Sequence, residues 1–276
     1  MTASEKLKCL REHMQKHNVD AFIALSADPH MSEYLPDYWK IREWLTGFTG
    51  SVGTILVTQD IAGLWVDGRY WVQAETQLKD TGFSLQKLTS DESSSHWAWL
   101  SQNLKANANV SVNTQTVSVQ QFEVLQRIAK LNNLNIVENI DLISEIWQDR
   151  PALPVQAVYE MKEGINALSR AEKIEKIRET LTSKQIKGHF ISAVDDIAWI
   201  LNCRGADVEY NPVFLSHLYI DSKQTILFCD LNKFDDALVS RFKSENITIL
   251  DYTESKNFLN KLQVSSVLID PAKVSY

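Results

Sequence analysis

The feature that most limits the fold of this chain is an internal repeat: the same order of predicted helices and strands occurs in both halves of the sequence. Short apolar runs alternate with amphipathic segments in the first half, and after Pro151-Ala-Leu-Pro154 a similar alternation begins again. Two prolines this close together interrupt regular structure, so we expect domains at 1–154 and 155–276. A period this long does not fit solenoid repeats, whose units are far shorter. The sequence therefore predicts two similar α/β domains.

The first half alternates helical and extended segments as a layered α/β domain does. A helix is expected over 4–17, because its apolar residues recur at three- and four-residue spacing. The run Ala21–Leu25 shows no polar alternation, which predicts a strand covered on both faces. The apolar runs 54–57 and 63–66 flank a short polar turn, which is typical of a hairpin. Further elements are helices over 70–78, 93–104 and 119–131, and strands near Phe83 and Ile136.

The second half opens with a long charged helix, expected over 167–185, whose apolar residues lie on one face. The remaining elements are a strand over 189–191, a helix over 196–201, hairpin strands over 214–220 and 225–229, a helix over 234–242, a strand over 247–250, a helix over 255–262 and a strand over 267–269. Each domain is thus predicted to contain a mixed β-sheet, with a hairpin in it, flanked by helices.

Composition excludes two classes of partner. The 276 residues are 44% hydrophobic and 23% charged, as in a globular protein, and the net charge is −7 without a Lys/Arg-rich run. Nucleic acid and anionic lipid surfaces are therefore not expected as partners. No stretch approaches the roughly 20 apolar residues that cross a bilayer, and the start of the chain is polar. The widely spaced Cys9, Cys203 and Cys229 favour a reducing compartment, so we predict a cytoplasmic protein.

Five phrases in order along the chain carry a resemblance to a known family. They are Asp28-Pro-His-Met-Ser-Glu-Tyr34, Trp44-Leu-Thr-Gly-Phe-Thr-Gly-Ser-Val-Gly53, Trp65-Val-Asp-Gly-Arg-Tyr70, Trp147-Gln-Asp-Arg-Pro151 and the run from Asp195-Asp-Ile-Ala-Trp199 to Asn211-Pro-Val-Phe214. Together they resemble the first two domains of the three-domain, cytosolic Xaa-Pro aminopeptidases (aminopeptidase P) of the creatinase and prolidase superfamily. The resemblance covers essentially the whole chain. One departure is Cys203, where that group usually has leucine.

The resemblance implies that the peptide-bond chemistry belongs to a further domain, the family's pita-bread catalytic domain, which we expect beyond residue 276. That domain would hold two divalent metal ions, Mn or Zn, and would act on short peptides with proline at the second position. The two domains of this chain would narrow access to the active site and help to arrange a homo-oligomer such as a dimer. The chain by itself is predicted to be inactive.

The histidines of this chain do not form the ligand set of a dinuclear hydrolase, which needs about five ligands around cations roughly 3.5–4 Å apart. None of the six belongs to an HExxH or a comparable carboxylate-histidine cluster. His13 and His17 share a helix face, but no acidic third ligand is evident from the sequence. We therefore predict neither a metal site nor a catalytic residue in this chain.

Two further patterns resemble sites but have simpler explanations. Asp195 and Asp196 form an acidic pair, yet they precede an apolar helical run, where carboxylates cap free helix N–H groups. The glycine loop 47–53 lacks the lysine of a P-loop and precedes a strand rather than a helix, so its glycines are expected to permit a tight turn. Ser51 in this loop has no histidine in its sequence context and is not expected to be a nucleophile.

Four residues are candidates for a substrate cleft. Arg69 follows a glycine turn at a predicted strand end, and the resemblance implies that it reaches toward a cleft formed with the catalytic domain; a salt bridge with Asp67 is the structural alternative. Arg204 lies in a polar loop at the same place in the second repeat, where a structural network with Asp207 and Asn211 is favoured. His30 and Glu33 complete the set: they lie in the polar loop 26–38 and would contribute to a rim, with a locally satisfied loop as the alternative.

Two other functions remain open from the sequence. The chain would be a stand-alone binding or assembly module if the catalytic domain has been lost, by gene truncation or otherwise. A weaker alternative is an unrelated α/β nucleotide-binding protein. Metal ligands of the Asp, His and Glu type beyond residue 276 would favour the peptidase, and tight nucleotide binding would favour the last alternative.

Overall fold

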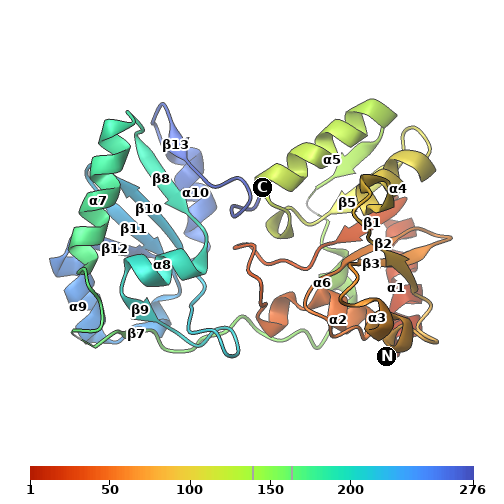
Figure 1. Cartoon of the computed structure of the whole chain (residues 1–276), viewed down its shortest axis with the longest axis horizontal. Coiled ribbons are helices and arrows are strands. Elements are labelled where there is room, and N and C mark those ends of the chain that lie inside the picture. Colours follow the sequence, from red (N-terminus) through yellow and green to blue (C-terminus); the bar gives the residue numbers. More distant parts are fainter. Residues whose placement is uncertain (139, 163) are drawn as a thin grey trace. The chain divides into compact units, whose positions relative to one another are not determined.

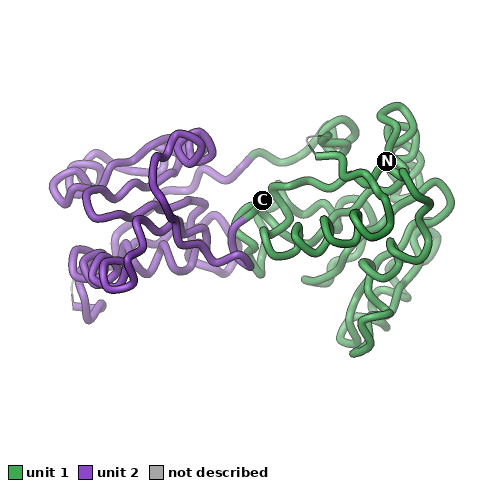
Figure 2. Tube along the Cα trace, turned by 90° about the horizontal axis from the view of Figure 1, so that it is seen from above, with its two compact units in different colours: residues 1–152, 275–276 green, residues 153–274 purple. Residues whose placement is uncertain are grey.

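The computed structural model describes residues 1–138, 140–162 and 164–276. They form two compact units, each built of a mixed β-sheet and helices (Figures 1 and 2). Unit 1 comprises Met1–Ala152 together with Ser275–Tyr276, and unit 2 comprises Leu153–Val274. The predicted fold class, two α/β domains with mixed sheets, is confirmed. No helix in these ranges is both long enough and apolar enough to cross a bilayer.

Unit 1 is organised around a six-stranded sheet with the order β4-β3-β2-β1-β5-β6. Strand β1 pairs antiparallel with β2 and parallel with β5, and β2 and β3 form the predicted antiparallel hairpin. The outer pairs, β3 with β4 and β5 with β6, are parallel. The strand bounds are β1 Ala21–Ala24, β2 Thr54–Val57, β3 Ala62–Val66, β4 Ser84–Lys87, β5 Asn109–Val112 and β6 Asn135–Val137.

Helices cover both faces of this sheet. One apolar cluster joins Phe22 and Ala24 to helices α1, α2, α3 and α6, and the other joins Ala21 and Ile23 to α4 and α5. The prediction that β1 is covered on both faces is therefore confirmed. The helix bounds are α1 Ala3–Lys16, α2 Ile41–Thr46, α3 Trp71–Gln77, α4 His96–Asn103, α5 Val119–Asn132 and α6 Leu142–Ile146.

Unit 2 has a five-stranded sheet with the order β12-β11-β10-β8-β13 and a small pair of β7 with β9. Its strands are β7 Tyr159–Glu160, β8 Gly188–Ile191, β9 Cys203–Arg204, β10 His217–Asp221, β11 Thr225–Phe228, β12 Ile247–Leu250 and β13 Val267–Leu268. Its helices are α7 Arg170–Ser183, α8 Val194–Ile200, α9 Asp236–Ser244 and α10 Glu254–Lys261. A single apolar cluster connects α7, α8 and α9 to the strands of the sheet.

The two sheets share one topology. Reading from β4 to β5 in unit 1, and from β12 to β13 in unit 2, the neighbouring strands pair parallel, antiparallel, antiparallel and parallel. The repeated order inferred from the sequence therefore corresponds to a repeated sheet. It places the end of β1 in unit 1 and the end of β8 in unit 2 at equivalent positions.

Two local predictions need correction. Asp195 and Asp196 lie in the first turn of α8, where their charge suits the helix dipole, but the cap position is Ala193, which makes no side-chain hydrogen bond. In the glycine loop, Gly47 ends helix α2 in a left-handed conformation with φ 77° rather than turning the chain into the hairpin. Both errors arise because the helix boundaries are set by backbone geometry that the residue types alone do not fix.

Candidate functional site

One edge of the unit 1 sheet gathers polar side chains from distant parts of the sequence. Ala24 at the end of β1 pairs with Ile55 in β2, and Thr54 pairs with Trp65 near the end of β3. The carboxyl ends of β1 and β3 therefore meet the amino end of β2. Side chains that flank these three ends come together, although they are up to about 45 residues apart in sequence.

Arg42 is a buried cation at this edge. It is 7% exposed, and its Nη1 donates to Ser26 Oγ, which follows β1, and to Ser51 O at 3.1 Å, which precedes β2. Its guanidinium lies 5.5 Å from the centre of the Phe48 ring. Burial lowers the pKa of Arg42 to about 10, and within the described ranges no carboxylate pairs with it. The site therefore holds a desolvated positive charge whose hydrogen bonds, among the described residues, go to a hydroxyl and a backbone carbonyl, and on which Glu43 acts only through its charge.

The glycine loop packs tightly around this arginine. The hydroxyls of Ser51 and Tyr70 lie 2.7 Å apart, and Phe48 meets the Tyr70 ring edge-on at 5.8 Å. A side chain at Gly50 would lie 2.3 Å from Phe48 Cζ and 2.8 Å from Tyr70 Cδ1. Glycine is therefore needed at position 50 for the close approach of two aromatic rings rather than for an anion cradle.

Arg69 forms the salt bridge that the sequence offered as the structural alternative. Its Nη2 lies 2.8 Å from Asp67 Oδ2 and its Nε 3.0 Å from Asp67 Oδ1, which is a two-point contact. The hydrogen bonds to Arg69 lower the pKa of Asp67, and the carboxylate in turn raises the pKa of Arg69. The Arg69 side chain nevertheless stays 68% exposed. Its remaining donors are open to a ligand.

The other two candidates of unit 1 have different surroundings. Glu33 is exposed, and its charge acts on Arg69, which places the two at the same edge. His30 is only 1% exposed, because Asp28 Oδ1 accepts hydrogen bonds from the backbone N–H groups of His30 and Ser32 and folds the loop inward. The imidazole of His30 is therefore buried, whereas the side chain of Glu33 is at the surface.

Arg204 and Asp207 of unit 2, which the sequence placed in one structural network, have separate side-chain partners. Arg204 donates from Nη1 to Ala198 O at 2.9 Å and to Cys203 O at 2.8 Å. Asp207 pairs instead with Lys233 at 2.5 Å and accepts a hydrogen bond from Leu215 N at 2.7 Å. The carboxylate of Asp207 is thus paired with a lysine from a later segment of the chain, and Arg204 is bound to backbone carbonyls. Each side chain has a structural role of its own.

His13 and His17 do acquire an acidic neighbour, which the sequence analysis missed. Glu145 from helix α6 lies 2.7 Å from His17 Nε2 and 3.7 Å from His13 Nε2, and Lys16 also reaches it at 3.3 Å. The partner comes from a helix more than a hundred residues away, so spacing could not reveal it. Across 1–138, 140–162 and 164–276, no group of three His, Cys, Asp or Glu side chains is placed to hold a metal ion.

Comparison with family models decides the classification. Two family models, both described as "Creatinase/Prolidase N-terminal domain", match this chain. One matches residues 6–146 and the other matches residues 149–276. The chain belongs to the creatinase/prolidase N-terminal domain family. Each half of this family member thus matches such a domain, in agreement with the repeated sheet topology.

Relatives of known name are peptidases. A probable Xaa-Pro aminopeptidase P from Laccaria bicolor is 33% identical over 99% of this chain and 42% of its own length. Xaa-Pro aminopeptidase 1 from Dictyostelium discoideum is 32% identical over 97% of this chain and 44% of its own length. The crystal structure of an X-prolyl aminopeptidase from Caenorhabditis elegans, described as a cytosolic enzyme with a di-nuclear active site, superposes with a TM-score of 0.92 at 30% identity.

That superposition covers 99% of this chain and 48% of the C. elegans chain. The chain therefore spans less than half the length of each of these three relatives. The described residues also do not fit a pair of metal ions, because the one cluster of two histidines and a carboxylate also contains the ammonium of Lys16.

Proposed function

We propose that this chain is the non-catalytic N-terminal region of a cytoplasmic Xaa-Pro aminopeptidase, in which it shapes substrate access and helps to assemble a homo-oligomer such as a dimer. The observation that carries the proposal is the match of both halves to creatinase/prolidase N-terminal domains, together with named relatives that are Xaa-Pro aminopeptidases over nearly the whole chain. The partner would be a carboxy-terminal pita-bread domain, which would hold the metal pair, Mn or Zn, and carry out the hydrolysis.

A peptide with proline at its second position needs a dedicated enzyme. Its scissile bond is a tertiary amide without an N–H, and the ring fixes φ, so the peptide does not offer the extended backbone that general peptidases bind. A narrow cleft with fixed charges would favour short peptides of this kind. The polar edge of unit 1 supplies such charges in Arg69 and Glu33, both exposed.

We assign the substrate-facing role to Arg69, with Glu33 beside it. The two-point contact with Asp67 fixes the guanidinium without covering it, which reduces the entropy lost when a ligand binds. The contacts of Arg204 with backbone carbonyls and the burial of His30 favour positioning roles for these two residues. They would hold their loops in place rather than touch the peptide.

A reconstitution assay tests the proposal. The chain is mixed with a separately expressed carboxy-terminal half of the same protein, and cleavage of a Xaa-Pro peptide is followed with Mn²⁺ present. We expect activity in the mixture and none from the chain alone. Cleavage by the purified chain without the other half would contradict the proposal. An inactive mixture of two folded halves would favour a stand-alone binding or assembly module.

Arg69→Ala is expected to lower kcat/KM of the reconstituted enzyme about tenfold, the effect of losing one charged contact of about 1.4 kcal/mol in the transition state. The unfolding free energy should change by less than about 0.5 kcal/mol, because the side chain is exposed. Arg241→Ala is the matched control, since Arg241 is also an exposed arginine paired with a glutamate. Equal losses of kcat/KM in both variants would remove Arg69 from the substrate cleft.

A further inference from the structure

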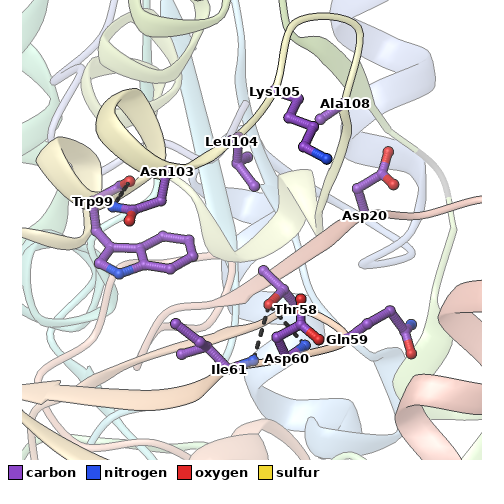
Figure 3. Close-up of a pocket in the computed structure, with 10 residues that line it drawn as sticks. All are labelled: Asp20, Thr58, Gln59, Asp60, Ile61, Trp99, Asn103, Leu104, Lys105 and Ala108. Carbon is purple, nitrogen blue, oxygen red and sulfur yellow. Dashed lines mark hydrogen bonds between the residues drawn. The ribbon is translucent and has the colours of Figure 1, made fainter.

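The opposite end of the unit 1 sheet carries a cavity of about 320 Å³ (Figure 3). Asp20 precedes β1, the turn 58–61 joins β2 to β3, and Leu104 and Lys105 follow helix α4. Since Ser26 and Arg69 follow the other ends of β1 and β3, this cavity is distinct from the polar edge described above. Its volume lies at the lower end of the range of small-molecule sites, about 300–1,000 Å³.

One wall of the cavity is apolar and held in place. The Trp99 ring meets Trp65 edge-on with 6.2 Å between ring centres, and Ile61, on the hairpin turn, leaves 37% of its surface exposed. Thr58 Oγ1 accepts hydrogen bonds from the N–H groups of Asp60 and Ile61, which fixes the turn (Figure 3). An aromatic ring and an exposed aliphatic side chain beside a fixed turn form a surface for an apolar group.

The rest of the lining carries charged side chains of both signs that are available to a ligand. Asp60 lies on the hairpin turn and Lys105 on the opposite side of the cavity, and both are exposed (Figure 3). Within the part of the chain that the structure describes, neither forms an ion pair. Asp20 uses Oδ2 to accept a hydrogen bond from Asn109 N at 2.7 Å, which leaves Oδ1 without a hydrogen bond from any residue that the structure describes. One cation and two carboxylates thus line the same small cavity.

We propose that this cavity binds a free α-amino acid with an aromatic or branched apolar side chain. Its ammonium pairs with Asp60 and Asp20, its carboxylate pairs with Lys105, and its side chain lies against Trp99 and Ile61. A zwitterion matches both signs of charge, whereas a phosphate or a simple anion would meet two carboxylates and a simple amine would leave Lys105 unpaired. The inference does not rest on the peptidase proposal, because it uses only the residues of this cavity.

Calorimetric titration of the 276-residue chain tests the inference with three probes. L-phenylalanine has both charges, phenethylamine lacks the carboxylate, and 3-phenylpropionate lacks the ammonium. We expect L-phenylalanine to bind with a Kd of about 1 mM or lower, and each of the other two about tenfold more weakly. No saturable binding of L-phenylalanine, or tighter binding of either singly charged probe, would overturn the proposal.

Two substitutions locate the binding. Asp60→Asn is expected to weaken the binding of L-phenylalanine about fivefold but not that of 3-phenylpropionate, and Lys105→Gln to weaken the binding of L-phenylalanine similarly but not that of phenethylamine. Both side chains are exposed, so the variants should fold. Lys79→Gln, an exposed lysine that does not line the cavity, is the control. Unchanged L-phenylalanine affinity in both cavity variants would contradict the assignment of the site.

Discussion

Replacing Lys233 by methionine is expected to destabilise unit 2 by about 3–5 kcal/mol, the usual cost of leaving one member of a buried ion pair without its partner. The ammonium lies 2.5 Å from Asp207 Oδ2, and the two side chains are 3% and 0% exposed. Methionine matches the apolar stem of lysine in length, so the substitution removes the charge and little packing. Backbone N–H groups of Leu215 and Gln156 also hydrogen-bond to the carboxylate, but they carry no charge that could replace the ammonium.

The loss of stability should depend on pH in a defined direction. Burial raises the pKa of Asp207, and the ammonium of Lys233 opposes that rise, so the variant should have a still higher pKa at this carboxyl group. A raised pKa in the folded state favours the protonated form there. The destabilisation is therefore smallest below the unfolded-state pKa of about 3.9 and increases as the pH rises through the folded-state pKa.

Denaturant unfolding at pH 5 and pH 8 measures both effects, with the larger loss expected at pH 8. The double variant Lys233→Met/Asp207→Asn is the control, because it removes the buried charge and should recover part of the stability at pH 8. Trp199 is the only tryptophan in unit 2 and is 54% exposed, so fluorescence reports poorly on this unit. Hydrogen exchange in β8, β10 and β11 is the better measurement. If the unfolding free energy fell by the same amount at both pH values, the unpaired charge of Asp207 would not be the cause of the destabilisation.

The strands of unit 1 that the sequence predicted best share one property, which is a nearly continuous apolar run. Strand β1 and the β2–β3 hairpin were predicted within one residue, because Ala21–Ala24, Thr54–Val57 and Ala62–Val66 are apolar and bounded by polar turns. Strand β5 was missed, although it lies beside β1 at the centre of the sheet. Its four residues, Asn109–Val112, include asparagine and serine, and their pairing with β1 rather than their composition makes them a strand.

The short helices show the same limit. Helices α2 and α6 have six and five residues, so neither offers enough sequence for a 3.6-residue period to be recognised. Their apolar side chains, such as Leu45 and Ile143, are buried against α1 and the sheet. Segments this short are not stable helices alone and depend on that packing. The local sequence therefore predicted the longer helices of the fold but not the short helices α2 and α6.

The candidate site was predictable where it depended on neighbours in sequence. Arg69 could be selected because a glycine turn after a strand exposes the next side chain, and its partner Asp67 is two residues away. The buried Arg42 was not recognised, because a charged residue in a sequence gives no sign that it is desolvated. Its partners Ser26 and Ser51 come from separate loops that only the sheet brings together.

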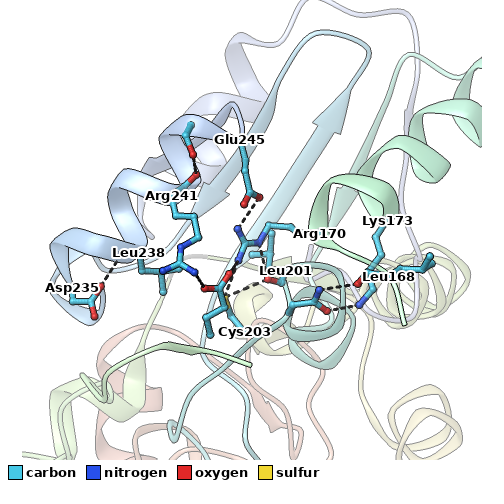
Figure 4. A network of polar contacts seen from close by, with 12 residues as sticks. Leu168, Arg170, Lys173, Leu201, Cys203, Asp235, Leu238, Arg241 and Glu245 are labelled. Carbon is cyan, nitrogen blue, oxygen red and sulfur yellow. Dashed lines mark hydrogen bonds and ion pairs between the residues drawn. The ribbon is translucent and has the colours of Figure 1, made fainter. Parts of the chain in front are cut away.

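After Lys233, Arg170 is the residue whose replacement is expected to lower the unfolding free energy of unit 2 most. Its side chain is 3% exposed and lies between two carboxylates, at 2.6 Å from Glu160 and 2.8 Å from Glu245, with Nε donating to Leu201 O at 2.7 Å (Figure 4). The guanidinium also stacks 4.5 Å from the centre of the Phe242 ring. One planar cation thus reaches two acids and a backbone carbonyl from three separate nitrogens in a fixed fork, a geometry that the single ammonium nitrogen of lysine does not offer.

Arg170→Met is expected to lower the unfolding free energy of unit 2 by about 3 kcal/mol, the lower end for a broken buried pair, because the glutamates keep 25% and 29% exposure and water can reach them. The chain offers a matched control in Arg241, which contacts the same Glu160 but is 52% exposed. Arg241→Ala should cost under about 1 kcal/mol, since exposed pairs contribute little. Denaturant unfolding, detected by hydrogen exchange, compares the unfolding free energies of the two variants. If they lost equal stability, burial would not be what makes Arg170 important.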